Sequence, residues 1–170
     1  MDALRIVRLS EADAPRYNEL LRRGVREHGD TLRIAESDIS TAPFTTASSE
    51  GSATFVAVTA EGAWAGTVAV ERERGRKKRE HIAWLLRMYV TKEFGGRGIA
   101  GALLTAAVAY AESLPGVAKL NLTVAAHNEH AVRLYERHGF SQFACELDAF
   151  RDPIARTELS LSLSFSGARD

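Results

Sequence analysis

The pattern of hydrophobic and polar positions along the chain predicts alternating strands and helices. Apolar residues alternate with polar ones or cluster with β-branched residues where strands are expected, and recur every three or four positions where helices are expected. The expected strands are 4–9, 53–59, 64–71, 81–90, 119–124, 141–148 and 156–163. The expected helices are 10–27, 98–113 and 128–138. Residues 29–52 have no clear period and carry Gly29, Pro43 and Gly51, which predicts a loop with one short helical turn.

The order of these elements predicts an α/β fold with a mixed central sheet of about seven strands and helices on both faces. The strand–helix–strand unit over 81–124 requires parallel pairing, whereas the short turns elsewhere require antiparallel hairpins. Residues 81–90 are almost continuously apolar, which is typical of a strand covered on both faces. Neither a linker nor an internal repeat is evident, so we expect one domain over 1–170.

Composition and charge narrow the class of protein. The 22 Lys and Arg residues balance 22 Asp and Glu residues, so the chain lacks the overall basic charge expected of a nucleic-acid binder. The single Cys145 excludes an internal disulfide or a Cys-rich zinc module and suits a reducing cytosol. The first five residues carry no apolar signal sequence, and the apolar run 99–111 is too short to cross a bilayer. We therefore expect a cytoplasmic protein without a nucleic-acid or membrane partner.

A glycine-rich turn between an expected strand and an expected helix is the most informative segment. Gly95, Gly96 and Arg97 precede the helix, Gly98 begins it, and Gly101 follows in the first turn. Glycines let backbone N–H groups approach a ligand closely, and the start of a helix carries partial positive charge. Arg97 would add to this charge. The glycine-rich turn and the start of the following helix therefore predict a binding site for a phosphate group.

The same glycines also satisfy the pattern GxGxxG over 96–101, which raises a dinucleotide-binding enzyme as an alternative. The acidic residue expected about 20 residues later is missing, because that region reads Lys119-Leu120-Asn121-Leu122. About 70 residues remain after the glycine-rich turn, too few for a doubly wound nucleotide domain. A P-loop is excluded because no Lys-Ser or Lys-Thr follows the glycines.

Two motifs resemble those of the GNAT superfamily, the acyl-CoA-dependent N-acyltransferases. The family's R/Q-x-x-G-x-G/A motif is similar to 95–100, with Gly98 and Ala100 at the small positions and Gly95 in place of Arg or Gln. Its second motif resembles 128–140, which begins with Asn128 and contains Tyr135. The resemblance covers residues 53–163 well and the first 50 residues in outline.

The resemblance implies a GNAT-type N-acetyltransferase that transfers an acetyl group from acetyl-CoA directly to the amine of a small molecule, peptide or protein. The strands 81–90 and 119–124 would splay apart and hold the pantetheine arm. The backbone N–H of Met88 would polarise the thioester carbonyl, Val90 would pair with pantetheine amides, and Tyr135 would protonate the departing thiolate. The residues implied in acetyl-CoA binding are Met88, Tyr89, Val90, Gly95, Gly96, Arg97, Gly98, Ile99, Ala100, Gly101, Asn128 and Tyr135.

The general base has no evident candidate. Family members often carry Glu or His at the positions that Trp84 and Leu86 occupy here, and neither side chain takes a proton. Glu80 and His81 lie further along the strand and would act only through water. An acceptor amine with a low pKa, or a chain of waters, would compensate. A catalytically silent module that senses acyl-CoA is the other alternative.

No metal is expected, because the cluster of His127, Glu129 and His130 begins a helix and lacks a persuasive third ligand. The resemblance assigns the acceptor site to the segments 28–52 and 148–155, which carry charges of both signs, and the acceptor itself is left open. A homodimer is also left open, since dimers are frequent among similar proteins.

Overall fold

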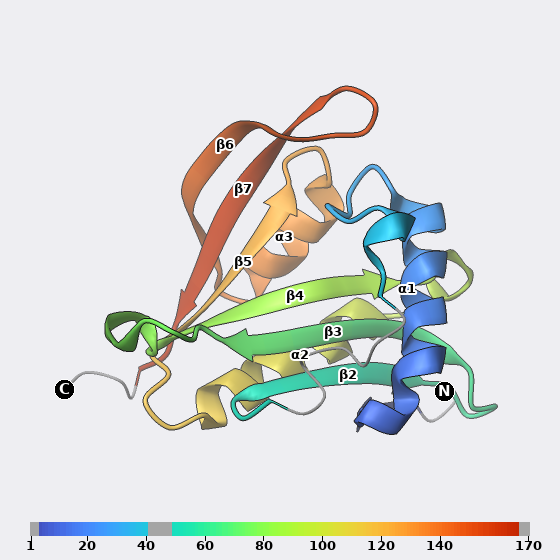
Figure 1. The fold of residues 1–170 in the computed structure, drawn as a ribbon, viewed down its shortest axis with the longest axis horizontal. Helices are drawn as coiled ribbons and strands as arrows, with labels where there is room; N and C mark the ends of the chain where they lie inside the picture. The colour runs from blue at the N-terminus through green and yellow to red at the C-terminus, as the bar shows by residue number, and fades with distance from the viewer. Residues whose placement is uncertain (1–3, 41–48, 167–170) are drawn as a thin grey trace.

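The structure is a computed structural model and describes residues 4–40 and 49–166. In this part of the chain, strands and helices follow the order predicted from the sequence (Figure 1). The strands are β1 (Arg5–Arg8), β2 (Ser52–Val58), β3 (Trp64–Arg72), β4 (Ile82–Val90), β5 (Lys119–Ala125), β6 (Ser141–Arg151) and β7 (Ala155–Ser164). The α-helices are α1 (Ala14–His28), α2 (Ile99–Ser113) and α3 (Glu129–Arg137). Short 3-10 turns are η1 (Glu11–Asp13), η2 (Glu36–Asp38), η4 (Lys77–Arg79) and η5 (Lys92–Phe94).

The strands form one sheet in the order β1-β2-β3-β4-β5-β7-β6, which confirms the predicted mixed sheet. The pair β4–β5 is parallel and the other pairs are antiparallel. The parallel pairing joins only Ile82–Trp84 to Lys119–Asn121. Beyond this short ladder β4 stays paired with β3 and β5 stays paired with β7, and the two halves of the sheet fan apart (Figure 1).

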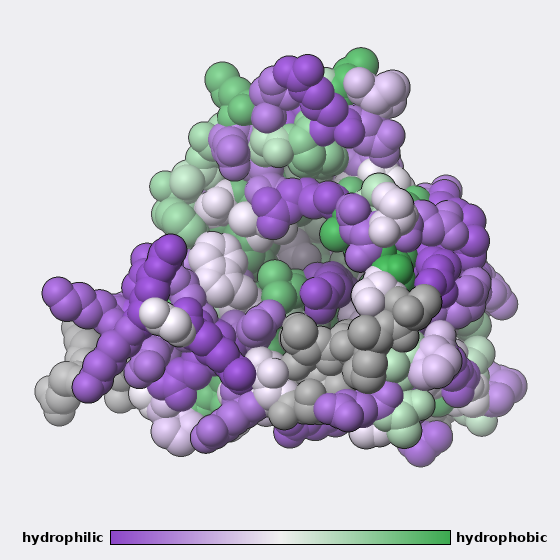
Figure 2. All heavy atoms as spheres, in the orientation of Figure 1, coloured by the Kyte–Doolittle hydropathy of each residue, from purple (hydrophilic) through white to green (hydrophobic). Residues whose placement is uncertain are grey.

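Helices cover both faces of the sheet, as predicted. Helix α1 lies in front of the sheet in Figure 1, and α2 and α3 lie behind it. The face that carries α1 is largely hydrophilic and has a central hollow (Figure 2). Because hydrophobic residues of each helix pack against alternate residues of the strands, the protein has a hydrophobic core on each face.

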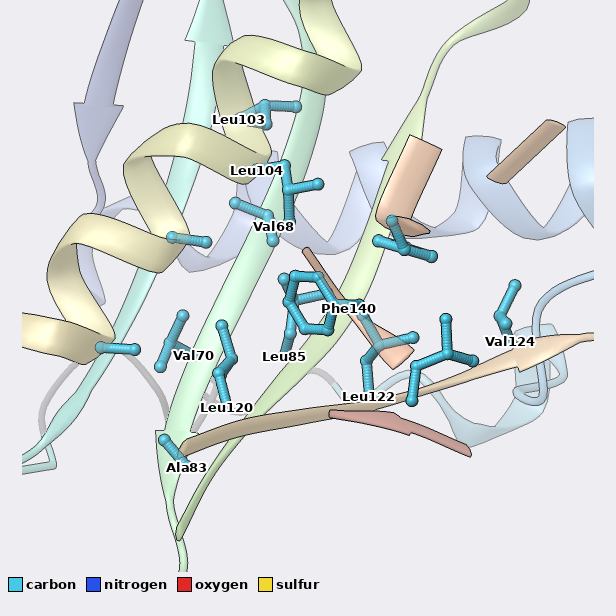
Figure 3. Close-up of a cluster of buried hydrophobic side chains, with 14 of the residues drawn as sticks. Val68, Val70, Ala83, Leu85, Leu103, Leu104, Leu120, Leu122, Val124 and Phe140 are labelled. Atoms are coloured by element: carbon cyan, nitrogen blue, oxygen red, sulfur yellow. The ribbon is translucent and has the colours of Figure 1, made fainter. Parts of the chain in front are cut away.

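The larger core lies between the sheet and helices α2 and α3. Leu103 and Leu104 of α2 belong to one cluster with strand residues such as Val68 and Leu120, and all four side chains are fully buried (Figure 3). The smaller core lies under α1 and contains Tyr17. Burial of these apolar side chains supplies most of the stabilisation, at about 25 cal/mol per Å² removed from water.

Two boundaries differ from the prediction by more than one residue. The first helix begins at Ala14, because Ser10 donates through its backbone N–H and its hydroxyl to Asp13 and closes the separate turn η1. The last hairpin is longer than expected, because β6 continues past Asp148 to Arg151. Its register shifts between Glu146 and Phe150, and this bulge interrupts the alternation that would have marked the strand in the sequence.

Strand β4 also contains a bulge. Its register against β3 shifts between Thr67 and Ala69, and Arg87 adopts a left-handed conformation with φ of 50°. The bulge changes which side chains face each core, since Leu85 belongs to the α2 side and Tyr89 to the α1 side. The expectation that this strand is covered on both faces is wrong for its second half, where residues 86–88 and 90 are only half-buried.

Candidate active site

A cavity of about 820 Å³ lies where β4 and β5 diverge. Residues 85–90 of β4 line one side and residues 123–125 of β5 line the other. The glycine-rich turn closes one end, and the segment that follows α1 contributes residues 31–34 to the wall. Its volume lies within the usual range for small-molecule sites, so the half-buried residues of β4 are explained by a binding cleft.

The glycine-rich turn has the geometry of an anion cradle. Gly96 and Gly98 adopt left-handed conformations with φ of 74° and 76°, and Gly98 directly precedes α2. A Cβ atom built at Gly96, Gly98 or Gly101 meets no other heavy atom within 4 Å, so the space beside this turn is open. Backbone N–H groups in the first turn of a helix have no acceptor within that helix. An anion such as a pyrophosphate can therefore bind here.

Arg97 is exposed, and its guanidinium carbon lies 5.3 Å from the ring centre of Phe94. Phe94 lines the cavity, whereas Arg97 lies beside it on the surface. The residue can contribute charge to an anion at the mouth of the cavity, although it does not line the cleft.

Helix α1 holds the segment before the glycines in place. A carboxylate oxygen of Glu27 accepts a hydrogen bond of 2.8 Å from the backbone N–H of Lys92. Arg23 donates to the other oxygen of Glu27 at 2.7 Å and also reaches Glu93. No sequence signal links residues this far apart, so this brace was missed from the sequence.

Tyr135 and Met88, which belong to separate motifs, meet at the cavity. The Tyr135 hydroxyl donates to the sulfur of Met88 at 3.6 Å, and its ring packs edge-on against Phe140. The Tyr135 side chain is buried, and this burial raises the pKa of its hydroxyl. The hydroxyl therefore keeps its proton at neutral pH, as a general acid must.

Asn128 is the N-cap of α3: its side-chain oxygen accepts a hydrogen bond of 3.3 Å from the Ala131 N–H. It also lines the cavity.

The two residues at the end of β4, Tyr89 and Val90, make contacts with α1. The Tyr89 side chain turns to the α1 side, where its hydroxyl donates to the Leu20 carbonyl. The backbone carbonyl of Val90 lies 3.1 Å from a ring nitrogen of His28, which also lines the cavity.

The positions considered for a general base do not supply one. Leu86 lines the cavity and is apolar, and Trp84 lies outside it with its indole N–H donating to Glu73. Glu80 and His81 precede β4, at the end where that strand is paired with β5. They lie roughly 20 Å along the strand from Met88, which is too far for a relay through one water.

Two charged side chains on the α1 side of the cavity were missed from the sequence. Arg33, in the segment after α1, donates to Glu158 of β7 at 3.0 Å. The Glu158 side chain is only 4% exposed. Burial raises the pKa of its carboxyl; Arg33 opposes this rise and Glu146 adds to it. In the sequence Glu158 occupies a polar position of an alternating strand, which is also where a solvent-facing residue would stand.

Within residues 4–40 and 49–166, no three His, Cys, Asp or Glu side chains converge as a metal site requires. No helix in the same ranges is long and apolar enough to span a membrane. The sheet has one parallel pair, so it is not the parallel, doubly wound sheet of dinucleotide-binding domains. The GxGxxG pattern is therefore a coincidence of the glycine-rich turn.

Comparison with known proteins gives consistent matches. The model of the "Acetyltransferase (GNAT) family" matches residues 16–140. A curated relative, a "Probable spermine N(1)-acetyltransferase" of Bacillus subtilis subsp. natto, is 34% identical over 76 residues. That match covers 45% of this chain and 49% of the relative, so it spans about half the length of the curated protein.

Solved structures share the fold over nearly the whole chain. A GNAT family acetyltransferase from Streptococcus pneumoniae has a TM-score of 0.80 and 24% identity, covering 96% of this chain and 100% of its own. The protein yncA of Salmonella typhimurium, a putative acetyltransferase solved with its cofactor acetyl-CoA, has a TM-score of 0.81 and 17% identity. This second match covers 97% of this chain and 95% of that protein.

Proposed function

Because the chain belongs to the acetyltransferase (GNAT) family, we propose that it transfers an acetyl group from acetyl-CoA directly to the nitrogen of an amine. The observation that carries this proposal is the cavity between the diverging strands β4 and β5, with the glycine-rich turn at one end and Tyr135 in its wall. The open space beside the glycines fits the pyrophosphate of acetyl-CoA. The cleft beyond them gives its pantetheine arm a path between the strands.

In this proposal the chain binds acetyl-CoA largely through its backbone. The N–H groups of Gly98, Ile99, Ala100 and Gly101 bind the pyrophosphate, which the positive end of α2 stabilises. The backbone at 88–90 pairs with the pantetheine amides, as an added strand would. Asn128 contacts the arm from the opposite wall while it caps α3.

When bound, acetyl-CoA supplies the thioester whose carbonyl carbon the amine attacks. The Met88 N–H donates to the oxygen of that carbonyl as negative charge develops on it. Tyr135 donates its proton to the leaving thiolate. Cys145 is exposed on β6 and does not line the cavity, so the transfer proceeds without an acyl-enzyme.

The acceptor belongs to the amines of small molecules, peptides and protein N-termini. Polyamines are the first class to test, since the curated relative is described as a probable spermine N(1)-acetyltransferase. We place the reaction in the cytoplasm, where a free, exposed Cys145 stays reduced. A homodimer would cover exposed apolar side chains of the β6–β7 hairpin, namely Phe143, Leu147 and Ile154. Sedimentation of the purified chain tests that expectation.

The test of the proposed function is release of CoA thiol from acetyl-CoA in the presence of spermine, spermidine and a set of short peptides. Release that depends on an amine, with the acetylated product identified by mass spectrometry, supports the transferase. Binding of acetyl-CoA without release by any amine favours the sensing module instead. Absence of acetyl-CoA binding contradicts both.

A further inference from the structure

The side chain of Glu158 faces the part of the cavity that opens toward α1. On β5 the residues Leu120, Leu122 and Val124 face the core under α2 and α3, so Thr123 and Ala125 face the opposite side. Glu158 is the partner of Ala125 in the pairing of β5 with β7, and paired residues point to the same face. Tyr135 belongs to the core on the α2 side. The two side chains thus line one cavity from opposite faces of the divided sheet.

The surroundings of Glu158 favour a cation. A buried carboxylate requires partners, because removing its charge from water costs several kcal/mol. Glu158 has the Arg33 guanidinium at 3.0 Å and a hydrogen bond with the Thr123 side chain. The Arg33 side chain is 50% exposed, so it can return to water at little cost when another cation takes its place. Glu146, directly across on β6, adds a second negative charge nearby.

From this arrangement we infer that Glu158 receives the protonated amine of the acceptor and takes its proton, acting as the base that β4 lacks. This inference rests on the proposed function. It defines the acceptor as a primary aliphatic amine that arrives as an ammonium ion. The ammonium group replaces the Arg33 guanidinium beside the Glu158 carboxylate, in the cavity that Met88 and Tyr135 also line.

In the proposed transfer, Glu158 takes one proton from the ammonium group and releases it later to solvent. The freed lone pair forms a bond to the thioester carbonyl carbon, and the carbon–sulfur bond then breaks. The thiolate receives the proton of Tyr135. The second proton leaves the nitrogen as the amide forms and restores the Tyr135 hydroxyl, so one proton is released per acetyl group.

The raised pKa of the Glu158 carboxyl agrees with this role, which is inferred from the position and contacts of the side chain. A carboxylate that holds its proton more tightly is a stronger base toward an ammonium ion. Leu86 and the other apolar side chains of β4 lack any atom that could take this proton.

The test compares Glu158→Gln with Glu112→Gln, which removes an exposed carboxylate of α2 that does not line the cavity. Each variant of the full chain is first titrated with acetyl-CoA in a calorimeter. CoA release is then measured at neutral pH with spermidine and propylamine, which are protonated, and with methoxyamine, which is not. Glu158→Gln should bind acetyl-CoA like the wild type and lose about 100-fold or more in kcat/KM with the protonated amines. With methoxyamine it should stay within about 3-fold of the wild type, as Glu112→Gln should with every amine.

The inference is overturned if Glu158→Gln matches Glu112→Gln with the protonated amines, or if it loses activity equally with methoxyamine. It is also overturned if the wild type binds acetyl-CoA but acetylates neither protonated amine. Should Glu158→Gln fail to bind acetyl-CoA, Glu158→Asp decides, because a retained carboxylate should keep activity that the amide variant lacks. Failure of the wild type to bind acetyl-CoA is a different result and refutes the proposed function itself.

Discussion

Replacing Tyr135 with Phe separates chemistry from stability. The variant keeps the ring that packs against Phe140 and removes only the hydroxyl. In the described part of the chain that hydroxyl donates to the Met88 sulfur at 3.6 Å, and sulfur is a weak acceptor. We therefore expect the free energy of unfolding to change by no more than about 0.5 kcal/mol. Loss of the general acid should lower the rate of CoA release by about 10²- to 10⁴-fold, which is about 3 to 5 kcal/mol in the transition state.

The assay measures thiol release under saturating acetyl-CoA, together with thermal unfolding and an acetyl-CoA titration. Tyr110→Phe in α2 is the control, because its ring also packs edge-on against a phenylalanine, Phe55, away from the cavity. It should match the wild type in all three measurements. If Tyr135→Phe releases CoA within about 3-fold of the control, the assignment of Tyr135 as the acid is refuted.

Two further predictions concern stability. A Cβ atom at Gly24 would lie 2.8 Å from the Tyr89 ring, so Gly24→Ala should lower the free energy of unfolding by about 1–3 kcal/mol despite the better helix propensity of alanine. Gly101→Ala should not lower the free energy of unfolding, because a Cβ atom at Gly101 meets no neighbouring atom. Equal melting temperatures for the two variants would contradict this reasoning. Hydrogen bonds from Arg79 hold the pKa of Glu73 at about 2, below its ordinary 4.5. A lowered pKa stabilises the fold above pH 4.5 and loses this effect as pH falls toward 2, so the melting temperatures of wild type and Glu73→Gln should converge over that range. A constant difference between the two melting temperatures would exclude a stabilising effect of the lowered Glu73 pKa.

The sequence predicts the elements and the phosphate cradle because both depend on local patterns. Strand and helix periods repeat over neighbouring residues, and the left-handed turn at Gly98 needs a glycine that the motif makes visible. The cap at Asn128 is equally local.

The cavity and its acceptor side depend on contacts between distant segments. Apart from Arg87, residues 86–90 of β4 are as apolar as those of a fully covered strand, so the sequence does not distinguish a core from a cleft. Glu158 alternates with apolar residues as a solvent-facing side chain would, yet it is buried, and its partner Arg33 lies 125 residues away along the chain. The brace between Glu27 and Lys92 likewise exists only once α1 lies across the sheet. The acceptor segment predicted at 28–52 is described here only in part, since residues 41–48 lie outside the described ranges.

The most direct test of the central claim is a calorimetric titration with acetyl-CoA of the wild type, Gly98→Val and Gly75→Val. The two glycines have φ of 76° and 77° and open space around them, so valine imposes the same backbone strain at both. Only Gly98 lies in the cradle. We expect micromolar binding by the wild type and by Gly75→Val. Gly98→Val should bind at least about tenfold more weakly, a loss of about 1.4 kcal/mol of binding free energy. Equal affinities of the two variants, or no binding by the wild type, would contradict it.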